Sequence, residues 1–154
     1  MSARATSSVV GIALMVLLTV LSSAVVGATV FGIGPTDSAP PRVSMSASAD
    51  AARDRIALTH RSGDSLAVSD LRIEIRIDGT PLREQPPVPF FAASGFESGP
   101  TGPLNSAADG TWRAGETGAV RIADTNSPQL TTGATVTVHV YTEHYRIATV
   151  TARA

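Results

Sequence analysis

The residues between Arg4 and Asp37 carry no charge, and this uncharged run constrains the fold more than any other feature of the sequence. About 20 apolar residues suffice for a helix to span a bilayer, whereas the apolar region of a secretory signal covers only about 7–15 residues. Each large apolar side chain left in water costs about 1.5–3 kcal/mol. The run therefore predicts one hydrophobic helix, at residues 6–33, that lies in a membrane or packs against other helices.

Small residues recur along this run at the spacing of helix neighbours. Ser23 and Gly27 are four positions apart, as are Ala24 and Ala28, and Gly11 lies nearer the start of the run. Small side chains at this spacing let two helix backbones approach closely. Two interpretations are open: these residues are simply common in membrane helices, or they form a face that packs against copies of the same helix.

The start of the run matches a known pattern. Residues 4–11 read Arg-Ala-Thr-Ser-Ser-Val-Val-Gly and lead into the apolar stretch. This motif, followed by an apolar helix, resembles the N-terminus of archaeal type IV pilins, especially the haloarchaeal group. In that family the motif usually has valine where this chain has Thr6 and proline where it has Ser8. The resemblance implies a leader at residues 1–5 and a processing site at Arg4, Ala5 and Thr6, where a prepilin peptidase cuts between Ala5 and Thr6.

The same resemblance implies a function and its partners. The helix would stay on the mature subunit, insert in the membrane, and then bundle with other subunits as the core of a surface filament that serves adhesion. The implied partners are other copies of the chain, the prepilin peptidase, the pilus assembly machinery and the membrane. No cofactor is implied, and the expected role is structural, not enzymatic.

Two alternatives remain open for the same stretch. An ordinary secretory signal would have its apolar region at Val9 to Leu21 and a cleavage site near Ser22 to Ala24, which would release a soluble protein. The apolar run continues to Ile33, which argues against that interpretation. The other alternative is a membrane-anchored extracytoplasmic binding module that never polymerises.

The composition of the rest of the chain limits the choice further. The 154 residues leave space for one domain after the helix. Cysteine is absent, so the sequence offers neither disulfides nor thiolate ligands. The formal net charge is −1, and a nucleic-acid partner is not expected because it would require a clustered basic surface.

After the helix, Gly and Pro residues predict a linker at residues 34–41, and the hydrophobic period then changes to two. Leu71 to Ile77 alternates large aliphatic with charged residues and ends at the turn signal Asp78-Gly79. Strands are predicted at 71–77, 135–141 and 145–151, the last two as a hairpin, and more weakly at 43–49, 55–60 and 119–123. The predicted fold class is α+β: a single N-terminal helix followed by an all-β, immunoglobulin-like sandwich head at residues 42–154.

The pattern breaks down between Pro81 and Gly115, where most of the chain's aromatic residues gather: Phe90, Phe91, Phe96 and Trp112. Loops longer than about 12–15 residues are usually functional or disordered. One interpretation is that these aromatic side chains fill an open end of the sandwich core. The other is that they form an apolar contact surface for a neighbouring subunit or an adhesive target.

The sequence offers little for catalysis. His60, His139 and His144 have no metal-ligand spacing, and surface or edge positions are expected for them. The aspartates at 50 and 54, and at 64 and 70, match neither a calcium loop nor a catalytic pair. No catalytic residue and no metal site are therefore predicted.

Overall fold

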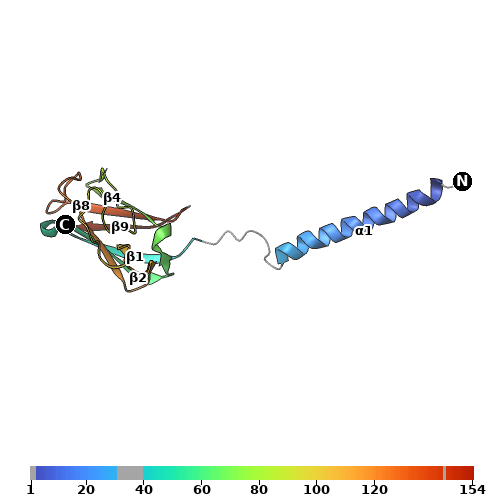
Figure 1. Ribbon diagram of the computed structural model, residues 1–154, viewed down its shortest axis with the longest axis horizontal. Coiled ribbons are helices and arrows are strands. Elements are labelled where there is room, and N and C mark those ends of the chain that lie inside the picture. The colour runs from blue at the N-terminus through green and yellow to red at the C-terminus, as the bar shows by residue number, and fades with distance from the viewer. Residues whose placement is uncertain (1–2, 31–39, 144) are drawn as a thin grey trace. The chain divides into compact units, whose positions relative to one another are not determined.

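The computed structural model describes residues 3–30, 40–143 and 145–154, and the chain divides into two compact units between Ala39 and Pro40 (Figure 1). The first unit contains the helix α1 (Ala3–Val30). This helix begins earlier than the predicted residue 6, in keeping with the high helix propensity of Ala and Arg. The predicted helix end at 31–33 and the predicted linker residues 34–39 lie outside the described residues.

The second unit is a β head in which all pairings between named strands are antiparallel. One sheet has the order β1 (Val43–Asp50), β2 (Arg55–Gly63), β7 (Thr117–Arg121). The other has the order β5 (Thr80–Pro81), β4 (Arg72–Ile77), β8 (Thr135–Tyr141), β9 (Arg146–Arg153). A third pair joins β3 (Leu66–Ala67) to β6 (Thr111–Trp112).

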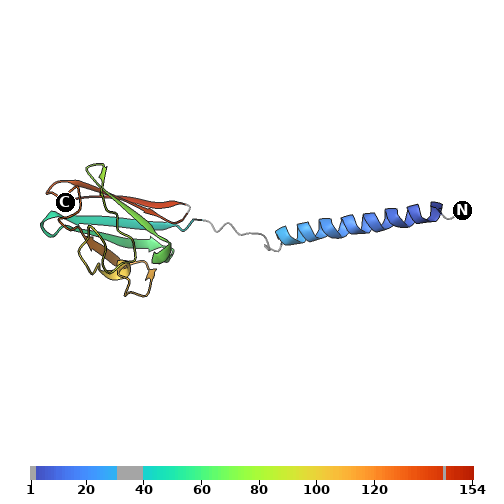
Figure 2. The same ribbon diagram turned by 45° about the horizontal axis from the view of Figure 1, so that its top comes forward.

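Along the strands of the four-stranded sheet, aliphatic residues alternate with polar ones, so the aliphatic side chains lie on one face. Ile75 of β4 lies opposite Val138 of β8, and both are almost completely buried. The other sheet contributes Ile56, Leu58 and Val120 to the same core cluster. The two sheets form two layers around this core, as Figures 1 and 2 show within the head.

The predicted turn at Asp78-Gly79 is confirmed. It joins β4 to β5, and both residues have positive φ, +48° and +79°, a conformation that Gly adopts freely and Asp tolerates. The Asp78 carboxylate accepts a hydrogen bond from the Thr135 N–H at 2.8 Å. The turn is thus tied to the start of β8.

The irregular segment between β5 and β7 is anchored by one buried amide. Asn126, 3% exposed, accepts hydrogen bonds from the Glu84 and Ser127 N–H groups and donates to the Glu84 and Gly95 carbonyls. A Cβ at Gly95 would lie 2.7 Å from the Asn126 amide nitrogen, so only glycine fits this close approach. Asn126 therefore uses all its donors and acceptors to fix the segment.

All six predicted strands are present, and β8 and β9 pair as the predicted hairpin. The predicted helix followed by a β head is therefore confirmed. Its immunoglobulin-like character stays a prediction. The short strands β3, β5 and β6 were not predicted, and neither were the 3₁₀ turns η1 (Ala51–Arg53), η2 (Val68–Asp70) and η3 (Gly102–Leu104).

Candidate functional site: the N-terminal helix and a pocket on the head

The helix α1 presents apolar side chains on all its sides. The described large apolar residues from Val9 to Leu21, together with Val26, each have 54–75% of their surface exposed. They include five consecutive positions, Leu14 to Leu18, and so no side of this part of the helix is polar. An isolated helix of this kind exposes to water a surface that other proteins bury.

Two hydroxyl groups in the middle of α1 bond to the backbone of the helix itself. The Thr19 hydroxyl lies 2.8 Å from the Met15 carbonyl oxygen and 2.9 Å from that of Val16. The Ser23 hydroxyl donates to the Thr19 carbonyl at 2.8 Å. Because these hydroxyls bond to the helix's own backbone, they do not oppose transfer of the helix to an apolar environment.

Gly11 has open space where a side chain would be, because a Cβ there would meet no atom within 4 Å. The fold of the single chain therefore does not require glycine at this position. Ser23 and Ala24 are exposed. For the other predicted processing and packing residues, Arg4, Ala5, Thr6, Gly27 and Ala28, the structure describes only a helical backbone.

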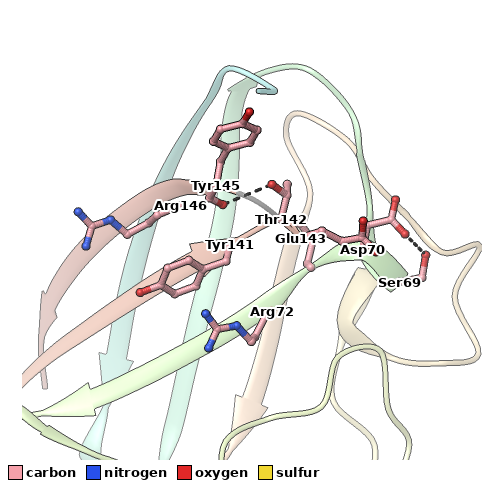
Figure 3. A pocket seen from close by; sticks show the side chains of 9 residues that line it. Ser69, Asp70, Arg72, Tyr141, Thr142, Glu143, Tyr145 and Arg146 are labelled. Carbon is pink, nitrogen blue, oxygen red and sulfur yellow. Dashed lines mark hydrogen bonds between the residues drawn. The ribbon is translucent and has the colours of Figure 1, made fainter. Parts of the chain in front are cut away.

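A second feature lies on the head, where the β8–β9 hairpin turns beside the start of β4. A pocket of about 730 Å³ is lined there by Ser69, Asp70, Leu71, Arg72, Tyr141, Thr142, Glu143, Tyr145 and Arg146 (Figure 3). The guanidinium carbon of Arg72 lies 4.3 Å from the centroid of the Tyr141 ring, within the range of a cation–π contact. Sequence reasoning missed this pocket because strand register joins residues far apart in the chain.

Comparison with known families identifies the first of these features. Residues 4–45 match the family of archaeal type IV pilin N-terminal segments. Residues 4–45 are therefore similar to the N-terminal segment of archaeal type IV pilins. The match confirms the resemblance seen in residues 4–11, covers helix α1 from Arg4 onward and ends in β1. Type IV pilins are structural proteins, not enzymes.

Two other results concern the helix α1 and the chain as a whole. Within residues 3–30, 40–143 and 145–154, no helix is long and apolar enough to cross a membrane, so the predicted membrane span is not confirmed. No curated protein matches the chain at a significant level.

Three of the four aromatic residues proposed as a contact surface lie in the core of the head. Phe90 is 5% exposed, Phe96 6% and Trp112 0%. Phe90 and Phe96 pack against each other at a centroid distance of 5.8 Å, and the Trp112 indole N–H donates to the Glu116 carbonyl. These three residues therefore fill the core, and only Phe91, which is 60% exposed, remains on the surface.

The position expected for His60 is wrong. His60 is fully buried, with Nδ1 3.3 Å from the Trp112 carbonyl oxygen and Nε2 3.1 Å from that of Ser62. It shares the inward face of β2 with Ile56 and Leu58, which explains its burial. His139 is half-buried beside the Thr149 hydroxyl, and His144 lies outside the described residues. The described residues include no group of side chains suited to hold a metal ion.

Proposed function

We propose that the chain is a structural subunit of a type IV pilus-like surface filament. One observation carries this proposal: a helix that is apolar on all sides, with the Thr19 and Ser23 hydroxyls bonded internally, occurs in a segment that matches the archaeal type IV pilin family. Burial of each large apolar side chain is worth about 1.5–3 kcal/mol, and helices from several subunits bury these side chains against one another. The head is then displayed outside the cell.

The route to the filament begins in the membrane. The uncharged run after Arg4 holds the subunit there, and a prepilin peptidase cuts between Ala5 and Thr6. The pilus assembly machinery then moves the helix from lipid into the bundle. The small residues Gly11, Ser23, Ala24, Gly27 and Ala28 support this step, because they permit close contact between helices.

The finished filament serves adhesion in this proposal. Phe91 is the member of the aromatic set that is exposed on the head, which makes it the contact point for a neighbouring head or a target surface. The head is extracellular in this arrangement.

The second candidate is a membrane-anchored extracytoplasmic β-sandwich binding module that does not polymerise. The pocket beside Arg72 and Tyr141 favours it, because a solitary receptor needs a ligand site on its head. The two candidates differ in what happens to the N-terminus and the helix after export.

N-terminal sequencing of the mature protein from a host with a type IV pilus system tests the proposal. The expected first residue is Thr6, and Arg4→Ala should leave the longer precursor in the membrane. Ser22→Leu is the matched control and should be processed normally. A mature protein that starts near Val25 would contradict the proposal in favour of secretion, and an uncut chain starting at Met1 or Ser2 would favour the solitary anchor.

A further inference from the structure

The pocket on the head has the size of a ligand site. Its volume, about 730 Å³, lies in the range of about 300–1,000 Å³ that is usual for small-molecule pockets. Its walls come from the turn η2, the first residue of β4, the last of β8 and the first of β9. The pocket thus lies within the head and does not depend on the helix.

One wall of the pocket is cationic. Strand pairing places Arg72 beside Tyr141, and Tyr141 beside Arg146, on the outer face of the four-stranded sheet. The Arg72 guanidinium stacks on the Tyr141 ring at 4.3 Å, which engages its flat face and leaves the N–H groups at its edge able to donate. Figure 3 shows Arg72, Tyr141 and Arg146 together on one side of the pocket.

The positive charge on this wall has no ion-pair partner in the described part of the chain. Among the described residues, neither Arg72 nor Arg146 forms an ion pair, and both are exposed. Five other arginines of the head do form ion pairs: Arg53, Arg76, Arg83, Arg113 and Arg121. Two guanidinium groups are therefore available to bind a carboxylate from outside the chain. The paired N–H groups of a guanidinium match the two oxygens of a carboxylate.

The opposite wall is acidic and rich in hydroxyls. The Asp70 carboxylate accepts a hydrogen bond from the Ser69 hydroxyl at 2.9 Å, and both side chains lie across the pocket from the two arginines (Figure 3). Tyr145, 46% exposed, is positioned by the hydrogen bond from the Thr142 N–H to its carbonyl at 2.8 Å. The Tyr145 ring adds an apolar surface to a pocket that has donors on one wall and acceptors on the other.

This combination narrows the chemistry of the ligand. A purely apolar ligand would leave the charged groups desolvated and unpaired. A polyphosphate chain has neither hydroxyl donors for Asp70 nor an apolar ring face to pack against tyrosine. A sugar that carries a carboxylate fits all parts: the carboxylate bonds to the arginines, the hydroxyls bond to Asp70, and the C–H face of the ring packs on tyrosine.

We propose that the pocket binds an acidic saccharide, with Arg72 and Arg146 holding the carboxylate, Asp70 accepting from the sugar hydroxyls, and Tyr145 packing against the sugar ring. This inference goes beyond assembly of a filament, since a solitary anchored head would bind the same ligand.

Calorimetric titration of the full-length chain with trigalacturonate, in a polyoxyethylene detergent that contains no sugar, tests the proposal. The trimethyl ester of the same trisaccharide is the neutral probe. The expected result is one bound trigalacturonate per chain and at least tenfold weaker binding of the ester. Arg72→Gln and Arg146→Gln should each weaken trigalacturonate binding at least tenfold, with an unchanged circular dichroism spectrum.

Arg61→Gln is the matched control, because Arg61 is an exposed arginine on β2, in the other sheet. It should bind trigalacturonate within twofold of the wild-type affinity. If Arg61→Gln weakened trigalacturonate binding as much as the pocket substitutions do, the effect would come from the net charge of the protein, and the proposed site would be wrong. Equal binding of acid and ester, or no binding of trigalacturonate by the wild type, would also overturn it.

Discussion

The side chain of Gln85 pairs with the backbone of Ile75 as a neighbouring strand would. Its amide oxygen accepts from the Ile75 N–H at 2.7 Å, and its amide nitrogen donates to the Ile75 carbonyl at 3.0 Å. The same nitrogen donates to the Leu82 carbonyl at 3.0 Å. The short strand β5 pairs only with Arg76 and Ile77, so one side chain extends the sheet where that strand ends.

Gln85→Ala should lower the free energy of unfolding by about 1–3 kcal/mol, because the Ile75 N–H loses its partner in a half-buried position. Urea unfolding of the head, residues 40–154, followed by circular dichroism, measures this. Gln129→Ala is the control, since that exposed amide donates to loop carbonyls only, and it should cost less than about 1 kcal/mol. Equal effects of the two substitutions would contradict the role of Gln85.

Ile75→Asp should unfold the head, because it places an unpaired carboxylate at a position that is 1% exposed. Glu74→Gln, on the outer face, removes an ion pair with Arg76 of 2.9 Å and should change the free energy of unfolding by at most about 1 kcal/mol. The unaltered head should fold without the helix, since its core cluster contains only head residues. A helical or unfolded circular dichroism spectrum of the unaltered head would contradict this account.

The sequence predicted the elements whose pattern is long and regular. The uncharged run identified the helix, and the alternation in residues 71–77 and 135–141 identified β4 and β8, since one buried face produces a period of two. Two-residue strands such as β5 and β6 have no such period. Their residues pair because the long strands bring them together.

The burial of His60 and Trp112 shows why the candidate sites were harder to predict from the sequence than the strands. His60 continues the inward parity of Ile56 and Leu58, a signal present in the sequence. Its carbonyl partner on Trp112 is distant in the chain, and nothing local predicts that contact. The pocket beside Arg72 and Tyr141 has the same origin in strand register.

The ion pair of Asp109 and Arg113 should give the head a specific pH dependence. Arg113 Nη1 donates to the Asp109 carboxylate at 2.7 Å and the Thr111 N–H donates at 3.0 Å, and these bonds hold the pKa of Asp109 below its usual 3.8. The ionised form therefore stabilises the fold above that pH, and the contribution is lost as the pH falls through the lower, folded-state pKa.

Asp109→Asn should consequently lower the Tm at neutral pH, and the difference from wild type should shrink as the pH falls through the folded-state pKa of Asp109, which lies below 3.8. Thermal unfolding across this pH range measures the difference. Asp124→Asn is the control, because Asp124 is exposed and has no ion pair among the described residues. A Tm difference for Asp109→Asn that stays constant while the wild-type carboxyl becomes protonated would contradict the prediction.

Gly11→Leu should block assembly while the single chain folds normally. A side chain at Gly11 meets no atom of its own chain within 4 Å, so any loss must come from contacts with other helices. Overpacking there should cost about 1–3 kcal/mol per subunit contact. Met15→Leu, a volume-conserving change at a residue 75% exposed, is the control and should assemble. A membrane-fraction blot beside the filament yield separates failed assembly from failed insertion.

The central claim is tested most directly in cells that express the chain together with a type IV pilus system. Filaments are sheared from these cells, viewed by electron microscopy, and their protein is identified by mass spectrometry. The account predicts filaments built from chains that begin at Thr6, and none from the Gly11→Leu variant. Recovery of the wild-type chain only as monomers in the membrane fraction, with no filament that contains it, would contradict the account.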